Sequence, residues 1–282
     1  MSDINHFIFD SKLEGPSLLC LGAIHGNETC GTDAILKIMT QIQQGHLKIG
    51  KGKLTCIPIC NPEAYQRKKR YVHANLNRLF GCQEDFEAYE KDLVREISKF
   101  INSHDYILDL HSYHSKGNPF IFLDTDHQRE VDLAKSVGIK DIITGWPEMY
   151  NEKDYTTSGY AHALGKISLT VECGHHHDPQ SSIVAYDVLR KTLNYLDMVN
   201  FSSASIPNHH IVHANTIHYK AREGCFSKNW QHMDCLEPNE VIASYADGTE
   251  IKVLEKCYIL LPYENAQIGD EWFYTGTSLE DL

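Results

Sequence analysis

A histidine and a glutamate, three residues apart, directly follow an apolar run near the N-terminus of this 282-residue chain. Residues 18–24 are typical of a buried strand, and His25-Gly26-Asn27-Glu28 comes next. A tight turn at Gly26 allows His25 and Glu28 to point at one centre. An imidazole nitrogen and a carboxylate oxygen are ordinary zinc ligands, and a catalytic zinc has three protein ligands and one open position. The pattern therefore predicts two ligands of a metal site, with zinc favoured over other divalent ions.

Two further apolar runs end in residues with related chemistry. Residues 106–110 form a second predicted strand that leads into His111, and Asp109 lies two positions earlier on the same face. From there the Asp109 carboxylate is placed to accept the free ring N–H of a metal-bound imidazole. Residues 168–171 form a third predicted strand, and Glu172 follows it. We therefore predict His111 as the third metal ligand and Glu172 as an acid–base group.

These three strand ends have to be weighed against chance, because the chain contains 17 histidines. For His25 and Glu28 alone, an incidental pair is an equally good explanation. Three separate strand ends are harder to explain in this way, because ligands of open α/β sheets bind at the carboxyl edge of the strands. The histidine run 175–177 is a weaker candidate, since consecutive histidines cannot all face one ion. We expect it to lie mostly outside the site.

The elements that must position these residues alternate between strands and helices. Apolar residues recur at helical spacing in several segments, and short β-rich runs separate them. The predicted helices are 29–44, 84–101, 129–137 and 182–199, and further predicted strands are 53–60, 119–123 and 140–144. This order predicts an α/β fold with a mixed, mostly parallel sheet and helices on both faces.

The pattern changes near a serine-rich stretch that ends before Pro207. Short strand-like runs dominate beyond it, and Asp247-Gly248 is typical of a hairpin turn. We therefore predict a catalytic α/β domain at residues 1–204. Residues 205–282 are predicted to form a small β-rich C-terminal domain that caps the active site.

Five motifs, in this order along the chain, resemble the succinylglutamate desuccinylase/aspartoacylase family, zinc-dependent relatives of the carboxypeptidases. They are His25-Gly26-Asn27-Glu28, Asn61-Pro62, the run from Arg70 to Phe80 that contains Asn75-Leu76-Asn77-Arg78, Asp109-Leu110-His111, and Glu172-Cys173-Gly174. The resemblance spans residues 17–175. It implies a zinc carboxypeptidase-like fold and one Zn²⁺ per chain.

The resemblance also implies an activity, the hydrolysis of the amide bond of an N-acyl amino acid. A metal-activated water would be the nucleophile, with Glu172 as the general base that passes the proton to the leaving amine. Arg70 would stabilise the charge that develops on the former carbonyl oxygen. Asn77 and Arg78 would bind the substrate carboxylate, for which the planar guanidinium is suited.

Two positions depart from the family pattern. In aspartoacylases, an arginine upstream of the catalytic glutamate helps to grip a second carboxylate, whereas His162 stands there in this chain and Lys166 is the nearest cation. Tyr263 is the candidate for the family's tyrosine from the C-terminal domain. We therefore expect a succinylated or otherwise acylated amino acid in preference to acetylaspartate. The sequence identifies neither the acyl group nor the amino acid.

Two other functions remain open at this point. One is a non-catalytic zinc- or ligand-binding module on the same fold, and the other is a carboxypeptidase that acts on small peptides. Fold alone does not choose among the three. A substitution of Glu172 that leaves metal binding intact separates a catalyst from a binding module.

Composition limits the partners. The net charge of −12 argues against nucleic acid or an anionic membrane surface, and it leaves a small anionic substrate as the expected partner. The basic run 67–70 is a local exception, in which we expect Arg70 to point inward. No apolar run is long enough to span a membrane, and no secretory signal is expected from the N-terminus. Nine cysteines without regular spacing predict reduced thiols in a cytoplasmic protein. The sequence does not fix the oligomeric state, and a homo-oligomer remains possible.

Overall fold

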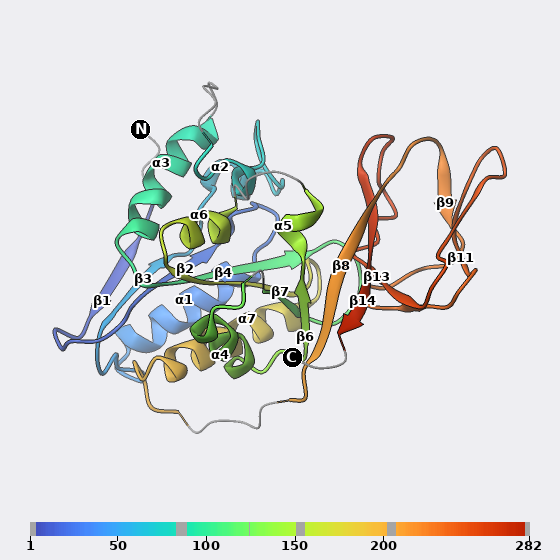
Figure 1. Cartoon of the computed structure of the whole chain (residues 1–282). Helices are drawn as coiled ribbons and strands as arrows, with labels where there is room; N and C mark the ends of the chain where they lie inside the picture. The colour runs from blue at the N-terminus through green and yellow to red at the C-terminus, as the bar shows by residue number, and fades with distance from the viewer. Residues whose placement is uncertain (1–3, 83–88, 124, 151–155, 202–206, 280–282) are drawn as a thin grey trace.

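A mixed sheet of 11 strands runs through the described part of this computed structural model, which comprises residues 4–82, 89–123, 125–150, 156–201 and 207–279 (Figure 1). Its order is β1-β3-β2-β4-β7-β5-β6-β8-β14-β13-β10. The strands are β1 Phe7–Asp10, β2 Ser17–Gly22, β3 Lys53–Ile57, β4 Tyr106–Tyr113, β5 Phe120–Phe122, β6 Asp141–Thr144, β7 Ile167–His175, β8 His210–Tyr219, β10 Cys235–Leu236, β13 Cys257–Leu260 and β14 Glu271–Leu279. Strands β3, β2, β4 and β7 are parallel neighbours, which brings their carboxyl ends to one edge.

Helices cover both faces of this parallel part of the sheet, as the alternating pattern predicts (Figure 1). The helices are α1 Cys30–Gln43, α2 Pro62–Gln66, the short 3₁₀ turn η1 Leu76–Arg78, α3 Tyr89–Asn102, α4 Gln128–Ser136, α5 Trp146–Met149, α6 Thr157–Ala163 and α7 Pro179–Tyr195. Helices α1, α4 and α7 pack on one face, and α3 and α6 pack on the other. The predicted fold class is confirmed.

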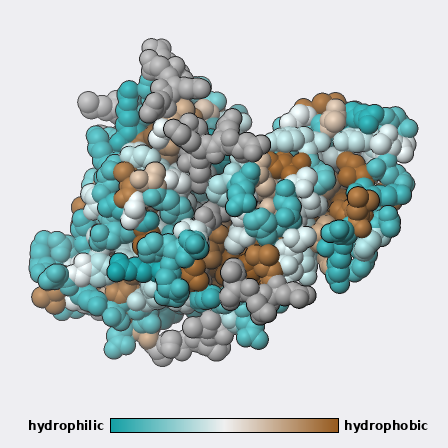
Figure 2. Space-filling model, in the orientation of Figure 1, coloured by the Kyte–Doolittle hydropathy of each residue, from teal (hydrophilic) through white to brown (hydrophobic). Residues whose placement is uncertain are grey.

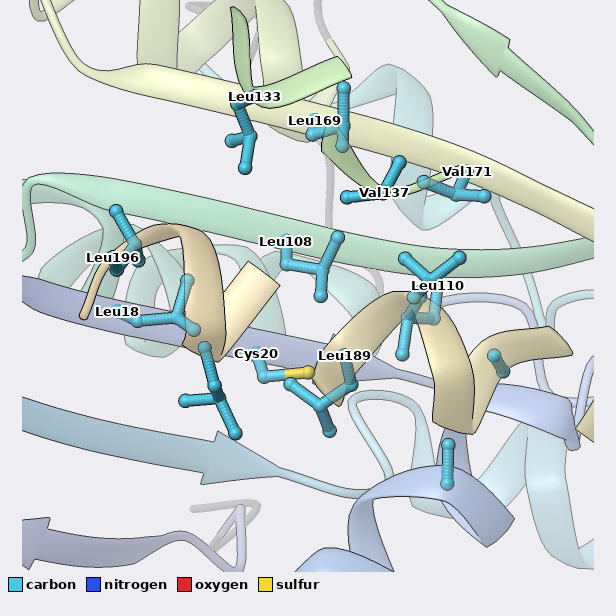
Figure 3. Close-up of a cluster of buried hydrophobic side chains, with 14 of the residues drawn as sticks. Leu18, Cys20, Leu108, Leu110, Leu133, Val137, Leu169, Val171, Leu189 and Leu196 are labelled. Atoms are coloured by element: carbon cyan, nitrogen blue, oxygen red, sulfur yellow. The ribbon is translucent and has the colours of Figure 1, made fainter. Parts of the chain in front are cut away.

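The larger core lies between the central strands and the layer of α1, α4 and α7 (Figure 3). Its labelled side chains come from β2, β4, β7, from α4 and α7 and from the residues that directly follow these two helices: Leu18, Cys20, Leu108, Leu110, Leu133, Val137, Leu169, Val171, Leu189 and Leu196. Full burial of one such aliphatic side chain stabilises the fold by about 1.5–3 kcal/mol. Because side chains alternate along a strand, Asp109 and His111 point to the opposite face, towards α3 and α6.

The C-terminal lobe, which we define as residues 207–279, continues the main sheet. Strand β8 pairs in parallel with β6, and β14, β13 and β10 follow in antiparallel order. A second sheet of three strands, β12 Glu250–Lys252, β11 Val241–Tyr245 and β9 Gly224–Phe226, completes the lobe. The lobe has its own core around Trp272 and Phe273. The predicted domain boundary, between 204 and 205, lies outside the described residues.

The face of the molecule shown in Figure 2 is mostly polar. On the face shown in Figure 2, apolar residues gather in small groups near the junction of the lobes and on the C-terminal lobe. No helix in the described ranges joins the length and the apolar character that crossing a membrane requires. All nine cysteines lie in described parts of the chain and are free thiols, as their irregular spacing predicts.

Several predicted boundaries differ from the structure. Helix α7 begins at Pro179 rather than at 182, because the Asp178 side chain accepts a hydrogen bond from the Gln180 N–H and caps the helix. Between β3 and residue 81, where no helix was predicted, the chain forms α2 and η1. The predicted start of the 84–101 helix lies outside the described residues. Strands β1 and β14 were not predicted.

Candidate active site

The three predicted metal ligands, His25, Glu28 and His111, converge at the carboxyl edge of β2 and β4. Their candidate ligand atoms all lie within 4.8 Å of one another, and all three residues are buried. The Glu28 carboxylate lies between the two rings: its Oε1 is 2.8 Å from His25 Nδ1, and its Oε2 is 2.8 Å from His111 Nδ1. One carboxylate thus faces the same nitrogen of both imidazoles.

The loop that carries His25 and Glu28 is packed too closely for a side chain at Gly26. A Cβ at this position would lie 2.1 Å from the backbone of Ala64, in α2. The Gly26 N–H donates to the Arg70 carbonyl, and the Glu28 N–H donates to the His25 carbonyl, which closes the turn. The chain enters the turn through Ala23, whose φ of 48° is costly for a residue with a Cβ. The close packing, the turn and the strained residue therefore fix the positions of His25 and Glu28.

The second nitrogen of each ring faces an oxygen atom. His25 Nε2 lies 2.9 Å from Asn75 Oδ1, which also accepts the Asn77 N–H and is thereby identified as the oxygen end of the amide. His111 Nε2 lies 2.9 Å from Asp109 Oδ2, the contact predicted from the strand register. For His25, the Asn75 oxygen places the ring proton on Nε2 and leaves the Nδ1 lone pair for another partner. For His111, the hydrogen bond within the described residues is made by Nδ1, to Glu28 Oε2, and Nε2 has only the close contact with Asp109.

This donor set fits a divalent metal ion. Among the described residues, His25 Nδ1 is a buried nitrogen without a hydrogen-bond partner, although a carboxylate oxygen lies beside it. Burial, followed by the positive charge of Arg70, lowers the pKa of His25 to about 4, so the ring is neutral near pH 7. A lone pair facing a carboxylate is unfavourable unless a cation joins them. Two imidazoles and one carboxylate are a common zinc set.

Glu172 lies beside this group, in β7. It is in register with His111 on the neighbouring strand, and it lines the same cavity. Its Oε2 is buried, with no hydrogen-bond partner in the described part of the chain. Burial, followed by the negative charge of Glu28, raises the pKa of Glu172 to about 8, against the opposing effect of His111 and Arg70. A carboxyl group with such a pKa exchanges protons readily near neutrality.

The predicted arginines and Asn77 line the cavity as well. Arg70 points inward and donates a hydrogen bond of 2.8 Å to Glu28 Oε1. Asn77 is buried, and its Oδ1 accepts the backbone N–H of Thr157 at the start of α6. The Arg78 guanidinium donates to the Asn77 carbonyl and lies 5.7 Å from the centre of the Tyr150 ring. The 3₁₀ turn η1 thus presents Asn77 and Arg78 together.

Both lobes contribute to the cavity, which has a volume of about 770 Å³. The C-terminal lobe supplies Tyr219, Leu261, Tyr263, Glu271 and Tyr274. This wall was missed by sequence reasoning except for Tyr263. Its residues come from the end of β8, from the segment after β13 and from β14, so the chain carries no local motif that unites them.

The cavity also contains histidines that were not predicted as site residues. His176 lines the cavity, and its Nδ1 lies 2.9 Å from the Ser112 hydroxyl. His114 lines it too and packs against Tyr263, with ring centres 4.3 Å apart. Burial lowers the pKa of both histidines to about 4. The signal for His176 was the strand itself, because β7 extends to His175 and carries the next residue to the cavity.

Three other histidines are not among the residues that line the cavity. His162, at the position of the family's second arginine, lies on α6 with its Nε2 2.9 Å from Glu130 Oε2. His73 is largely exposed and lies 3.5 Å from a Glu90 carboxylate oxygen. His177 is exposed.

Comparisons with known proteins identify the family of this chain. The sequence model of the succinylglutamate desuccinylase/aspartoacylase catalytic domain matches residues 14–198. A probable aspartoacylase of Acaryochloris marina is 26% identical over 204 residues, which cover 65% of this chain and 64% of that protein. A succinylglutamate desuccinylase of Pseudomonas paraeruginosa is 28% identical over 171 residues, which cover 57% of this chain and 51% of that protein. The matches thus span about half to two thirds of these relatives.

Solved structures share the fold. A succinylglutamate desuccinylase from Silicibacter sp. TM1040 superposes with a TM-score of 0.79 at 16% sequence identity. The superposition covers 97% of this chain and 88% of that one, so it includes the C-terminal lobe.

Proposed function

The chain belongs to the succinylglutamate desuccinylase/aspartoacylase family, and from this premise we propose that it is a zinc-dependent hydrolase that cleaves the amide bond of an N-acyl amino acid. One observation carries the proposal. Glu172, with its pKa raised to about 8, lies at the same cavity as the group His25, Glu28 and His111. Burial and the charge of Glu28 raise this pKa, and strongly perturbed acids in a cavity are typical of functional sites.

The residues divide the reaction among them. His25, Glu28 and His111 would hold one zinc ion, which when bound supplies the Lewis acidity that activates a water for attack on the acyl carbon. Glu172 accepts the proton of that water and then donates it to the nitrogen of the leaving amino acid. Its raised pKa belongs to the metal-free chain, and a bound dication would lower it and so favour the carboxylate form that accepts the proton.

Two arginines would stabilise two different negative charges, one that forms during the reaction and one that the substrate already carries. Arg70, held by Glu28, stabilises the negative charge that develops on the former carbonyl oxygen. Arg78, with Asn77, binds the carboxylate of the amino acid, which is present before and after the reaction. The substrate is therefore anionic at this end.

The shape of the cavity favours small substrates over peptides. Residues of the C-terminal lobe, such as Leu261 and Tyr263, stand opposite the metal-site residues around a space of about 770 Å³. Pockets of this size suit compact ligands. An acylated amino acid fits this description better than an extended peptide does.

Hydrolysis of a panel of acetyl, succinyl and longer-acyl amino acids, with chelator and after zinc add-back, tests the proposal. We expect turnover of at least one class, loss of turnover with chelator, and recovery with zinc. Chelator-resistant hydrolysis would contradict the metal mechanism. Stoichiometric zinc binding without hydrolysis of any substrate would favour a binding module. Release of C-terminal residues from small peptides, without deacylation, would favour a carboxypeptidase.

A further inference from the structure

One wall of the cavity has no part in the proposed chemistry. Phe122 from β5, Trp146 from α5 and Tyr274 from β14 line it, and we call these three residues the aromatic wall. The ring centres of Trp146 and Tyr274 are 4.6 Å apart, and those of Trp146 and Phe122 are 4.7 Å apart. The face of an aromatic ring carries a negative electrostatic potential, which attracts cations.

A carboxylate stands beside this wall. Glu271 lines the cavity, and its two oxygens accept hydrogen bonds from the hydroxyl groups of Tyr150, at 2.8 Å, and Tyr274, at 2.5 Å. Burial raises the pKa of Tyr150 and Tyr274 further above the ordinary phenol range. Both hydroxyls therefore keep their protons and act as donors, so Glu271 is fixed in place as the acceptor.

Two opposite charges in the cavity lack ion-pair partners. Arg70 has a carboxylate partner, Glu28, at 2.8 Å. Within the described ranges, neither Arg78 nor Glu271 has a group of opposite charge within 4.0 Å. The two are arranged around one side chain, because Arg78 lies 5.7 Å from the centre of the Tyr150 ring and Glu271 binds the Tyr150 hydroxyl. The neighbouring Asp270, which also lines the cavity, adds negative charge on the Glu271 side.

From this arrangement we propose that the amino acid part of the substrate carries an ammonium group on its side chain. Its carboxylate binds Arg78, and its ammonium group binds Glu271 against the aromatic wall. This proposal rests on the proposed function. An ammonium group is attracted both by a carboxylate and by aromatic faces. A second carboxylate, as in a glutamate side chain, would instead face Glu271 and Asp270 and be repelled.

The test compares Nα-acetylornithine with Nα-acetylnorleucine, which has a side chain of the same length and no charge, and with N-acetylglutamate. We expect kcat/KM to be about tenfold higher for the ornithine derivative than for the norleucine derivative, with the glutamate derivative lowest. In the Glu271→Gln variant, the ornithine-to-norleucine ratio should fall towards one. Glu255→Gln, an exposed change in the same lobe, should keep the wild-type ratio.

Titration calorimetry with free ornithine and norleucine gives a second readout that needs no turnover. If no acyl amino acid is hydrolysed, the proposed function fails, whereas tighter binding of ornithine that is lost in Glu271→Gln still supports the ammonium subsite. If substrates are hydrolysed without a preference for ornithine, or if Glu271→Gln leaves the ratio unchanged, the subsite proposal is overturned and the proposed function stands. Failure of both ligands to bind would also overturn the subsite.

Discussion

The two walls of the cavity are assembled in different ways. The metal-site wall is built from residues that follow the ends of adjacent parallel strands, β2, β4 and β7. The opposite wall is built from Phe122, Trp146, Glu271 and Tyr274, which lie on a short strand, a four-residue helix and the last strand of the described chain. In the proposed reaction, the first wall carries the chemistry. The second is free to vary with the substrate, because no proposed bond-breaking step depends on it.

If this division holds, the largest effect should come from the metal-site wall. His111→Ala removes one of three ligands and leaves Glu28 and Asp109 without the ring that separates them. We expect this variant to lose its bound metal and its measurable turnover. Elemental analysis measures the first loss, and an initial-rate assay measures the second. His73→Ala, at a largely exposed histidine, is the matched control and should retain both. Full activity of His111→Ala would contradict the assignment of the reaction to the metal-site wall.

The next effect concerns the stability of the metal-free protein. The pKa of Glu172 is raised from an ordinary value of 4.5 to about 8, chiefly by burial. The folded chain therefore holds a proton that the unfolded chain releases between these values, and stability falls as the pH rises from about 5 to about 8. The loss should be on the order of 3 kcal/mol and should be absent in Glu172→Gln.

Urea unfolding at several pH values, with chelator present, measures this dependence. The difference between wild type and Glu172→Gln isolates the contribution of Glu172 from those of His25 and His111. A pH-independent difference would mean that Glu172 ionises in the folded chain as readily as in the unfolded one. That result would remove the acid–base argument for this wall.

A smaller effect on metal binding and activity is expected at Asn75, which contacts the ligand His25. The Asn75 side-chain oxygen holds His25 Nε2 and also caps the 3₁₀ turn that carries Asn77 and Arg78. Asn75→Ala should weaken metal binding or activity by about 10- to 100-fold, which is usual for groups that orient a ligand. It should also raise KM, because the turn loses its cap. Asn265→Ala, at an exposed site, is a suitable control.

The smallest effect should come from the opposite wall. Tyr274→Phe keeps the ring against Trp146 and removes one hydroxyl donor to Glu271. A lost hydrogen bond to a charged group corresponds to about 1.5–3 kcal/mol. Because the Tyr150 hydroxyl still holds Glu271, only part of this energy reaches the substrate, and we expect KM for an ammonium-bearing substrate to change by about tenfold or less, with kcat nearly unaffected. A large fall in kcat would mean that the two walls are not separable.

The same division explains how much the sequence predicts. His25, His111 and Glu172 each follow an apolar run of strand length, so parallel pairing alone places them at one edge. The register also predicts the contact of Asp109 with His111. These inferences need only local periodicity and the rule that ligands bind at carboxyl ends.

Glu271 and Trp146 offer no comparable signal. Glu271 reaches the cavity because β14 pairs with β8 in a sheet that continues between the lobes, which is a long-range property. Trp146 lies on a helix of four residues, too short for helical periodicity to be visible. The role of Asn75 was missed for a related reason, because a single-residue cap in a loop has no periodic pattern around it.

One measurement tests the central claim most directly: the metal content and kcat of Glu172→Gln beside those of the wild type, with Glu264→Gln as an exposed control. If Glu172 moves protons next to a metal held by His25, Glu28 and His111, the variant should retain about one zinc per chain. Its kcat should fall by about 10²- to 10⁴-fold. A zinc-loaded Glu172→Gln protein with wild-type turnover would contradict the account.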